Sequence, residues 1–348
     1  MGAVWVRTIP NSPGTVAVRV THPTLGSGVA TITVTEPAPG GPPAPFGQLA
    51  VQTMPVVLAA GQVDTVTATF TNHGLVGLDR VTLSPEAPQG WPAVATTATS
   101  FAGVSPGQSV TARWKLAPPA GTDPGSYTVT VRAVYSGAGQ RGVTAGSANL
   151  LVAYPSLQAA FDNTGISDNS DVDSADFDGV GNSYSAQALA AAGLTPGKKI
   201  SRGGVTLTWP DVAAGEPDNV IAAGQAVLLA GKGTTLGFVG ASSPNDEGGS
   251  GTVYYTDGTT STFSITLDNY WYPPDTSGDQ VVASTPYVNS QGLGGRPRGQ
   301  REHTVYVFYS GVPVDATKTV QAVVLPTGGS VPGSGRISGM HVFAMAVG

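Results

Sequence analysis

The sequence contains no cysteine, and this absence excludes disulfides, thiolate metal sites and cysteine nucleophiles together. It leaves the cellular compartment open, because exported β-sandwich proteins also do without cysteine. Charged residues are scarce as well, at 11% of the chain, against roughly 25% in an average soluble domain. The surface is therefore weakly charged.

Two further absences exclude classes of partner. The net charge is −6 and no run of Lys or Arg is longer than Lys198-Lys199, so the chain lacks the basic surface that nucleic-acid binders use. The longest apolar runs, such as residues 221–229, fall short of the roughly 20 residues that cross a bilayer. We predict no nucleic-acid partner and no membrane span.

The N-terminus has neither the basic nor the apolar region of a signal peptide. The chain is therefore either cytoplasmic or the downstream piece of a longer exported protein. The resemblances described below favour the second reading, and we expect an extracellular location.

Apolar and β-branched residues alternate with a period of two in several segments, which predicts strands at 15–21, 63–71, 126–135 and 303–310. Turn residues separate them at intervals typical of antiparallel sandwiches. A helix is predicted only at 185–192, with Ser185 as its cap. The fold class that follows is all-β, with tandem antiparallel β-sandwiches. The resemblances described below imply an immunoglobulin-like sandwich followed by a larger jelly-roll-like one.

A Pro/Gly-rich linker at residues 36–45 sets the first domain boundary, because proline fixes φ and removes the donors that a sheet needs. Upstream, residues 1–35 supply too few strands for a two-sided core, so we interpret them as part of an incomplete domain, which the second resemblance described below implies to be immunoglobulin-like. Residues 46–153 form a sandwich with Trp91 and Trp114 as a buried aromatic pair, and residues 155–348 form the last module.

Three resemblances follow from these motifs. Gly90-Trp91, residues 104–109, Trp114 and residues 118–127 resemble the NEW-type, NPCBM-associated domain, an immunoglobulin-like sandwich appended to glycoside hydrolases. Residues 14–34 are similar to the last strands of the C-terminal immunoglobulin-like domain in family-two glycoside hydrolases.

The last module contains Phe161 to Asp168, Phe177-Asp-Gly179, Tyr184 to Leu189 and Trp209-Pro-Asp211 in that order. It resembles the C-terminal β-sandwich of secreted glycoside hydrolases, among them mannosidases and galactosidases. The resemblance implies a carbohydrate-binding-like accessory module and names no catalytic residue.

Close carboxylates repel one another unless a cation neutralises them, and calcium prefers hard oxygen ligands. A dense group of aspartates therefore suggests a structural Ca²⁺ site, with candidate ligands Asp162, Asp168, Asp171, Asp173, Asp176 and Asp178. It is not an EF-hand, because counting from Asp171 puts Asp176 where the loop needs Gly and Asn182 where it needs Glu. The alternative is a solvated loop in which Asp168 and Asp173 cap turns.

Aromatic and basic residues of the last module suggest a sugar-binding surface. Pyranose C–H groups stack on aromatic rings, and sugar hydroxyls pair with Arg and similar groups. The candidate carbohydrate-binding residues are Tyr270, Trp271, Tyr272, Tyr287, Arg298, Arg301 and His303. Because residues 270–272 are three consecutive aromatics at a strand end, at least one must point away from the core. The alternative is that Trp271 and its neighbours close the edge of the sandwich.

No catalytic machinery is recognised, so the sequence leaves enzyme activity uncertain. Glycoside hydrolysis usually needs a positioned carboxylate pair, but the five Glu residues are isolated, and the four His residues are scattered without short-spaced partners. We therefore predict a non-catalytic accessory region of a secreted glycoside hydrolase, of mannosidase or galactosidase type, that contributes carbohydrate binding and spacing.

The expected partners are a glycan or polysaccharide and the catalytic domain of a parent hydrolase. One alternative is a purely structural stalk or adhesion segment without sugar binding. Another is a self-contained β-sandwich hydrolase.

Overall fold

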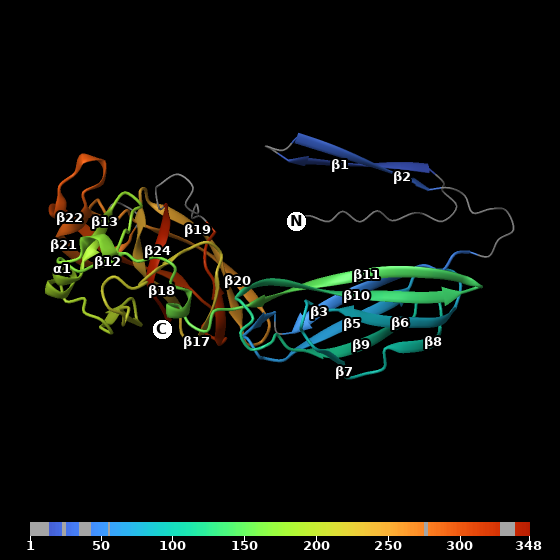
Figure 1. Ribbon diagram of the computed structural model, residues 1–348. Helices are drawn as coiled ribbons and strands as arrows, with labels where there is room; N and C mark the ends of the chain where they lie inside the picture. The colour runs from blue at the N-terminus through green and yellow to red at the C-terminus, as the bar shows by residue number, and fades with distance from the viewer. Residues whose placement is uncertain (1–13, 23–25, 35–42, 55, 275–277, 328–337) are drawn as a thin grey trace.

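The computed structural model describes residues 14–22, 26–34, 43–54, 56–274, 278–327 and 338–348. Strands form nearly all of its regular structure, so the predicted fold class of tandem β-sandwiches is confirmed (Figure 1). Residues 1–13 of the predicted partial domain and 36–42 of the predicted linker lie outside the described residues. The domain boundaries stay predictions.

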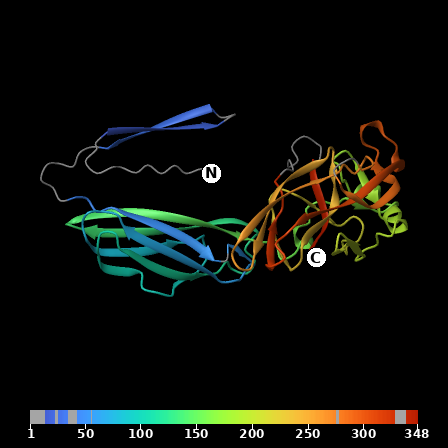
Figure 2. The ribbon, with the colours of Figure 1, turned by 180° about the vertical axis from the view of Figure 1, so that it is seen from behind.

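An antiparallel hairpin of β1 (Gly14–His22) and β2 (Gly26–Val34) comes first along the described chain. It confirms the strand predicted at 15–21. In the described ranges these two strands pair only with each other, and Figures 1 and 2 show the hairpin apart from the sheets of both sandwiches. Its assignment to a partial immunoglobulin-like domain stays a prediction.

The first sandwich consists of two sheets with one apolar core between them. One sheet has the order β3 (Gly47–Met54), β5 (Asp64–Asn72), β9 (Ser109–Leu116) and β7 (Ala93–Ala95). The other has the order β4 (Val57–Leu58), β11 (Gln140–Val152), β10 (Gly125–Gly137), β6 (Leu78–Glu86) and β8 (Ser100–Val104).

Period-two alternation places the core of this sandwich. Every second residue of β5 is buried, from Asp64 to Asn72, because successive side chains of a strand point to opposite faces. Trp91 and Trp114 are both buried, as the sequence predicts, and Trp91 packs on Tyr127 with ring centroids 4.8 Å apart. The two tryptophans thus belong to the packed interior and are not available as a surface site.

The second sandwich is larger. Its seven-stranded sheet has the order β12 (Ile166–Ser167), β13 (Asn182–Ser185), β21 (Gln280–Gln291), β22 (Arg298–Pro313), β18 (Thr235–Ser243), β24 (Gly339–Val347) and β16 (Val220–Ile221). Its four-stranded sheet has the order β17 (Ala226–Gly231), β23 (Val320–Val324), β19 (Glu247–Tyr255) and β20 (Thr260–Leu267). A separate hairpin consists of β14 (Lys199–Arg202) and β15 (Val205–Thr208).

Named strands pair antiparallel except in two short parallel pairs, β4 with β11 and β12 with β13. Three 3₁₀ turns complete the described structure, η1 (Gln158–Ala160), η2 (Val172–Ser174) and η3 (Leu293–Gly295). The core of the second sandwich is rich in aromatic rings, and the Phe177 ring lies 5.0 Å from that of Tyr184 and 4.8 Å from that of Tyr270.

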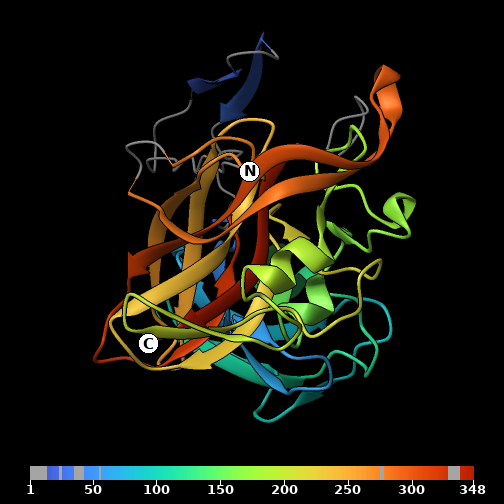
Figure 3. The ribbon, with the colours of Figure 1, turned by 90° about the vertical axis from the view of Figure 1, so that its left-hand side faces the viewer.

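The predicted helix is confirmed as α1 (Ala186–Ala191). Ser185 caps it, since its side chain accepts a hydrogen bond from the Ala188 N–H, which would otherwise lack a partner. Gly193 follows the helix with a φ of +91°, a conformation that glycine adopts without strain. Figure 3 shows α1 (green) at the end of the second sandwich, where the β21–β22 hairpin (orange) projects. No helix in the described ranges is long and apolar enough to cross a membrane.

The two sandwiches lie end to end and share a small apolar contact (Figures 1 and 2). Val57 of the first sandwich clusters with Ala226 and Ala322 of the second. Gln321 also donates a hydrogen bond of 3.1 Å from Nε2 to the Val57 carbonyl. The connection is therefore a packed junction and not only a covalent link.

A chain of polar side chains crosses the interior of the second sandwich. The carboxylate of Asp218 is fully buried and accepts hydrogen bonds from the Gly165 and Ile166 N–H groups and from Asn219 Nδ2. Asn219 Oδ1 lies 2.8 Å from Nδ1 of buried His341, which therefore donates. Burial raises the pKa of Asp218 to about 7 and lowers the pKa of His341 to about 3.

These two shifts have opposite effects on stability. The pKa of Asp218 is higher in the folded chain than its ordinary 3.8, so its stabilising contribution is complete below pH 3.8 and is lost as the pH rises towards 7. The pKa of His341 is lower than its ordinary 6.5, so its contribution is complete above pH 6.5 and is lost as the pH falls towards 3. Between about pH 4 and 6.5 the two contributions oppose each other.

Replacing Asp218 with Asn should therefore expose the effect of His341. Relative to the wild type, the unfolding free energy of Asp218→Asn should fall by about 1.4 kcal/mol for each pH unit between 6.5 and 4. Urea unfolding followed by tryptophan fluorescence across this range measures it. Glu216→Gln, which removes an exposed carboxylate of the same loop, is the control. Parallel curves for Asp218→Asn and the wild type would contradict the prediction.

Candidate functional site

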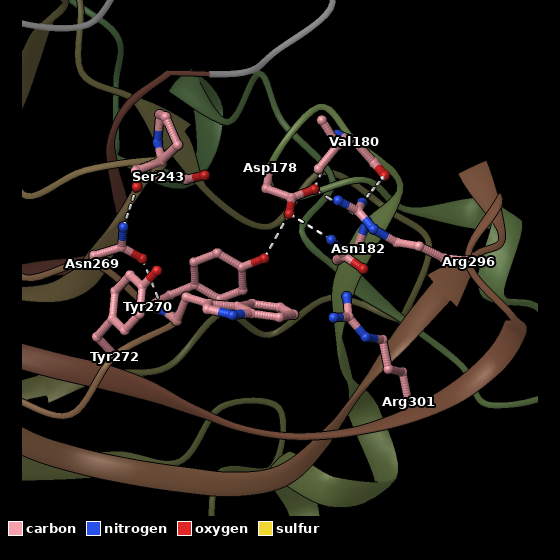
Figure 4. Close-up of a pocket in the computed structure, with 11 residues that line it drawn as sticks. Asp178, Val180, Asn182, Ser243, Asn269, Tyr270, Tyr272, Arg296 and Arg301 are labelled. Carbon is pink, nitrogen blue, oxygen red and sulfur yellow. Dashed lines mark hydrogen bonds between the residues drawn. The ribbon is translucent and has the colours of Figure 1, made fainter. Parts of the chain in front are cut away.

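An open cavity of about 300 Å³ lies in the second sandwich, between segments that are far apart in the sequence (Figure 4). This volume is at the lower end of the range typical of small-molecule sites. Its lining residues are Asp178, Val180, Asn182, Ser243, Pro244, Asn269, Tyr270, Trp271, Tyr272, Arg296 and Arg301.

The segment that follows β20 forms one side of the cavity, and local hydrogen bonds hold it. Asn269 Oδ1 accepts from the Trp271 N–H at 2.9 Å, an Asx turn that asparagine favours. The Asn269 side chain also donates to the Pro244 carbonyl, and the Tyr270 N–H donates to the Ser242 carbonyl at 3.0 Å. This turn is therefore fixed to the end of β18.

Residues of β22 support the Trp271 ring. The His303 ring stacks on it with centroids 3.8 Å apart and an interplanar angle of 17°, and His303 Nε2 lies 2.9 Å from the Trp271 carbonyl oxygen. The Arg301 guanidinium carbon lies 5.0 Å from the Trp271 ring centroid, within the range of a cation–π contact. Trp271 is thus oriented by the sheet while it stays half-buried and lines the cavity.

Asp178 forms the inner wall. Its Oδ1 accepts from the Val180 and Asn182 N–H groups, and its Oδ2 accepts from Asn182 Nδ2 and the Tyr270 hydroxyl, both at 2.7 Å. Burial, followed by the nearby Asp178 charge, raises the pKa of Tyr270 well above its ordinary value, so the hydroxyl keeps its proton and donates. The charge of Asp178 is satisfied within the protein.

Two buried polar atoms of the lining have no partner among the described residues. Asn182 Oδ1 and Ser243 Oγ belong to side chains that are 2% and 1% exposed, and neither atom forms a hydrogen bond. Leaving such an atom unpaired costs roughly 1–3 kcal/mol, so natural proteins rarely do so without a function. In Figure 4 Ser243 and Asn182 lie on different walls.

The structure brings together four of the predicted carbohydrate-binding residues, since Tyr270, Trp271, Tyr272 and Arg301 line the same cavity. Tyr270 is buried and Tyr272 is 61% exposed, which agrees with the expectation that one of three consecutive aromatics points outward. His303 supports Trp271 from outside the lining.

The other two predicted residues lie elsewhere. The Tyr287 hydroxyl accepts a hydrogen bond of 3.0 Å from Asn169 Nδ2, and Arg298 forms an exposed ion pair of 2.6 Å with Asp173. A carbohydrate-binding role stays a prediction for all seven residues, but Tyr287 and Arg298 are not among those that line the cavity.

The structure distributes the six predicted calcium ligands over separate contacts. Asp162 accepts from the Ile221 N–H, and Asp168 accepts from the Ser170 N–H in the predicted Asx turn. Arg298 lowers the pKa of Asp173 through its hydrogen bond and charge. Asp171 contributes its carbonyl to the turn at Ser174.

Asp176 and Asp178 are the close pair. The loop that carries them contains Gly179 and Gly181, whose φ values of +69° and +84° let the backbone N–H groups face these carboxylates. Burial, and then the charge of Asp178, raises the pKa of Asp176. Over the residues described, no group of three or more acidic or His side chains is placed to hold a metal ion. The calcium site stays a prediction.

Sequence reasoning did not single out Asn182, Ser243 or Asn269. These residues come from β13, the end of β18 and the segment after β20, which only the folded sheet brings together. The short polar segments that contain them look like ordinary turns. A weak signal is present at Asp268-Asn269, where an Asx residue directly precedes aromatic residues.

Two parts of the chain match known protein families. Residues 58–136 match the NPCBM-associated, NEW3 domain of alpha-galactosidase, which confirms the resemblance proposed from the sequence. Residues 153–331, just over half of the chain, match the AziU2-like beta-sandwich domain. The chain belongs to the AziU2-like β-sandwich family, and the cavity lies within the matched region. No curated protein matches the chain.

Several solved structures are similar in part, at TM-scores that carry no argument about function. The GAE domain of GGA2p from Saccharomyces cerevisiae has a TM-score of 0.23 and 9% identity over 31% of this chain and 97% of that domain. The secreted serine protease VesC from Vibrio cholerae has a TM-score of 0.26 and 13% identity over 80% of this chain and 49% of the protease. A family 2 β-glucuronidase has a TM-score of 0.18 and 10% identity over 96% of this chain and 37% of the enzyme.

The calcium prediction can be tested on the full chain. A ligand that binds only the folded state stabilises it by about 2.7 kcal/mol at a hundredfold excess over its Kd, so melting should shift upward with CaCl₂ and return with EGTA. Asp176→Asn should abolish the shift if the close pair holds the ion, whereas Asp257→Asn, on a distant turn, should keep it. A melting temperature that calcium and chelator leave unchanged rejects the site.

Proposed function

We propose that this chain is a non-catalytic accessory region of a glycoside hydrolase and that its second sandwich binds a saccharide in the cavity at Trp271. The NEW3-type match supports the association with a hydrolase, because that domain is described from alpha-galactosidase. A catalytic domain of the same or a partner chain, of galactosidase or mannosidase type, and an extracellular setting belong to this proposal.

The observation that carries the binding proposal is the pair of unpartnered atoms, Asn182 Oδ1 and Ser243 Oγ, in the wall that also contains Trp271. A pyranose offers an apolar C–H face for a tryptophan ring and hydroxyls that donate and accept at its edge. The cavity offers the complementary set. Its ring is held in advance by His303, so little side-chain order has to be gained on binding.

An accessory role agrees with the chemistry of the wall. Its carboxylate, Asp178, already accepts four hydrogen bonds, and the described lining residues include no second carboxylate. Paired carboxylates on either side of a glycosidic bond are the usual requirement for hydrolysis. The lining therefore favours binding over turnover.

Changing Trp271 to Ala tests the stacking surface. The affinity for the saccharide should fall about tenfold or more, because a ring contact of this kind contributes roughly 0.5–1.5 kcal/mol beyond the area it buries. Isothermal titration with mannosides, galactosides and their polymers measures the change. Tyr287→Phe, which alters an aromatic residue outside the cavity, should bind like the wild type. Real binding by the wild type that Trp271→Ala leaves unaltered would move the site elsewhere.

Changing Ser243 to Ala separates a ligand contact from a structural one. The variant loses a buried hydroxyl that has no partner in the described chain, so its melting temperature should stay the same or rise. Its saccharide affinity should nevertheless fall, by about three- to tenfold, because a hydrogen bond to the sugar is lost. A loss of stability without a loss of affinity would show that Ser243 serves the fold. No binding to any saccharide would leave the structural stalk as the function.

A further inference from the structure

We infer that the saccharide taken by this cavity carries an anionic group, such as the carboxylate of a uronic acid. This inference rests on the proposed function and adds the chemical class of the ligand. It follows from which charged groups of the lining form hydrogen bonds or ion pairs within the protein and which do not.

The cavity is positively charged although the chain is not. The net charge of the whole sequence is −6, but the described residues of the lining include two guanidinium groups, Arg296 and Arg301, and a single carboxylate, Asp178. A protein with few charged residues has few positively charged side chains. Two of them on one small cavity create a local positive potential that attracts anions.

Among the described residues, the Arg296 and Arg301 guanidinium groups form no ion pair with an acidic side chain. In the described part of the chain, ion pairs join Arg298 to Asp173 and Lys318 to Asp257. Arg296 donates a single hydrogen bond, of 3.1 Å, to the Val180 carbonyl, and Arg301 contacts the Trp271 ring. A guanidinium has five N–H donors in a planar fork, so most of the donor capacity of both residues faces a ligand or solvent.

The nearby acidic groups, in contrast, form hydrogen bonds within the protein. Each oxygen of Asp178 accepts two hydrogen bonds from the surrounding chain. Asp176, behind the wall, accepts from the Gly179 and Gly181 N–H groups. Most donors of Arg296 and Arg301 thus have no partner among the described residues, while both oxygens of Asp178 and the Oδ1 of Asp176 accept hydrogen bonds.

The arrangement of the walls fits a sugar acid. In Figure 4 Arg296 and Arg301 approach the cavity from one side, and Ser243, Asn269 and Tyr272 lie on the other. A planar carboxylate matches the fork of a guanidinium. The sugar hydroxyls then remain for the unpartnered Ser243 Oγ and Asn182 Oδ1. A uronic acid contains both kinds of group on one ring.

Matched ligands test the inference. The neutral probes are the methyl glycosides of galactose, glucose and mannose. Each is compared with its uronic acid, in which a carboxylate replaces the C6 hydroxymethyl group. Galactose 6-sulfate is a further anionic probe. In low salt, at least one uronic acid should bind about tenfold more tightly than its neutral partner. This preference should shrink as NaCl is raised, because the contact is partly exposed to screening.

Two arginine variants assign the preference to the cavity. Arg301→Gln and Arg296→Gln should each reduce the ratio of neutral to anionic Kd, and the double variant should bring it close to one. Arg298→Gln is the matched control, since it removes the same charge from β22, the strand of Arg301, at a residue outside the cavity lining. Near-ultraviolet circular dichroism confirms that each variant is folded.

The outcomes distinguish this inference from the proposed function. Binding of a neutral sugar that depends on Trp271, with no preference for its anionic partners, overturns the inference and keeps the proposed function. A preference that survives in the Arg296 and Arg301 double variant also overturns the inference. A preference for the 6-sulfate alone supports it with sulfate as the anionic group. Failure of every neutral and anionic probe overturns both.

Discussion

The hydrogen bond between Asp178 and Tyr270 joins the core of the second sandwich to the cavity. Phe177, next to Asp178 in sequence, packs against Tyr184 and Tyr270 in the aromatic interior. Trp271, the residue after Tyr270, lies in the cavity wall. One buried bond of 2.7 Å therefore sets the distance between two segments almost a hundred residues apart. Because the core is closely packed, the orientation of the wall is as well defined as the core itself.

The same sandwich treats its buried polar groups in two ways. Asp218, Asn219 and His341 form hydrogen bonds with one another inside the core, and these bonds connect strands and loops of the interior. Asn182 Oδ1 and Ser243 Oγ, which belong to residues that line the cavity, have no partner in the described part of the chain. Unpaired atoms of this kind lower stability, so the packed aromatic core has to offset them. Unpartnered buried atoms also occur away from the cavity, at Tyr309 and His341, but at Asn182 and Ser243 they belong to residues that line it.

The sequence predicts the fold better than the site because fold signals are local. Alternation of apolar residues locates β5, β10 and β22, and Ser185 with Gly193 bounds α1, since period and capping depend only on neighbours in the chain. The site depends on register: residues near 180, 243, 270 and 300 meet only after β13, β21, β22 and β18 pair. Composition pointed to Trp271 and Arg301, whereas nothing local separated Arg298 from Arg301. Only the folded strand shows that one pairs with Asp173 and the other contacts Trp271.

Which charged side chains of this cavity can bind a ligand depends more on the hydrogen bonds they already form than on their formal charge. Asp178 and Arg301 both belong to its lining, and a count of charges alone would treat them as equal and opposite. Backbone N–H groups and the Tyr270 hydroxyl disperse the charge of Asp178 over four bonds, which leaves little acceptor capacity for an incoming donor. The Arg301 guanidinium contacts a ring face, which attracts the cation but occupies none of the N–H groups in its plane. The cavity therefore offers a ligand the N–H donors of the arginines and the apolar ring of Trp271.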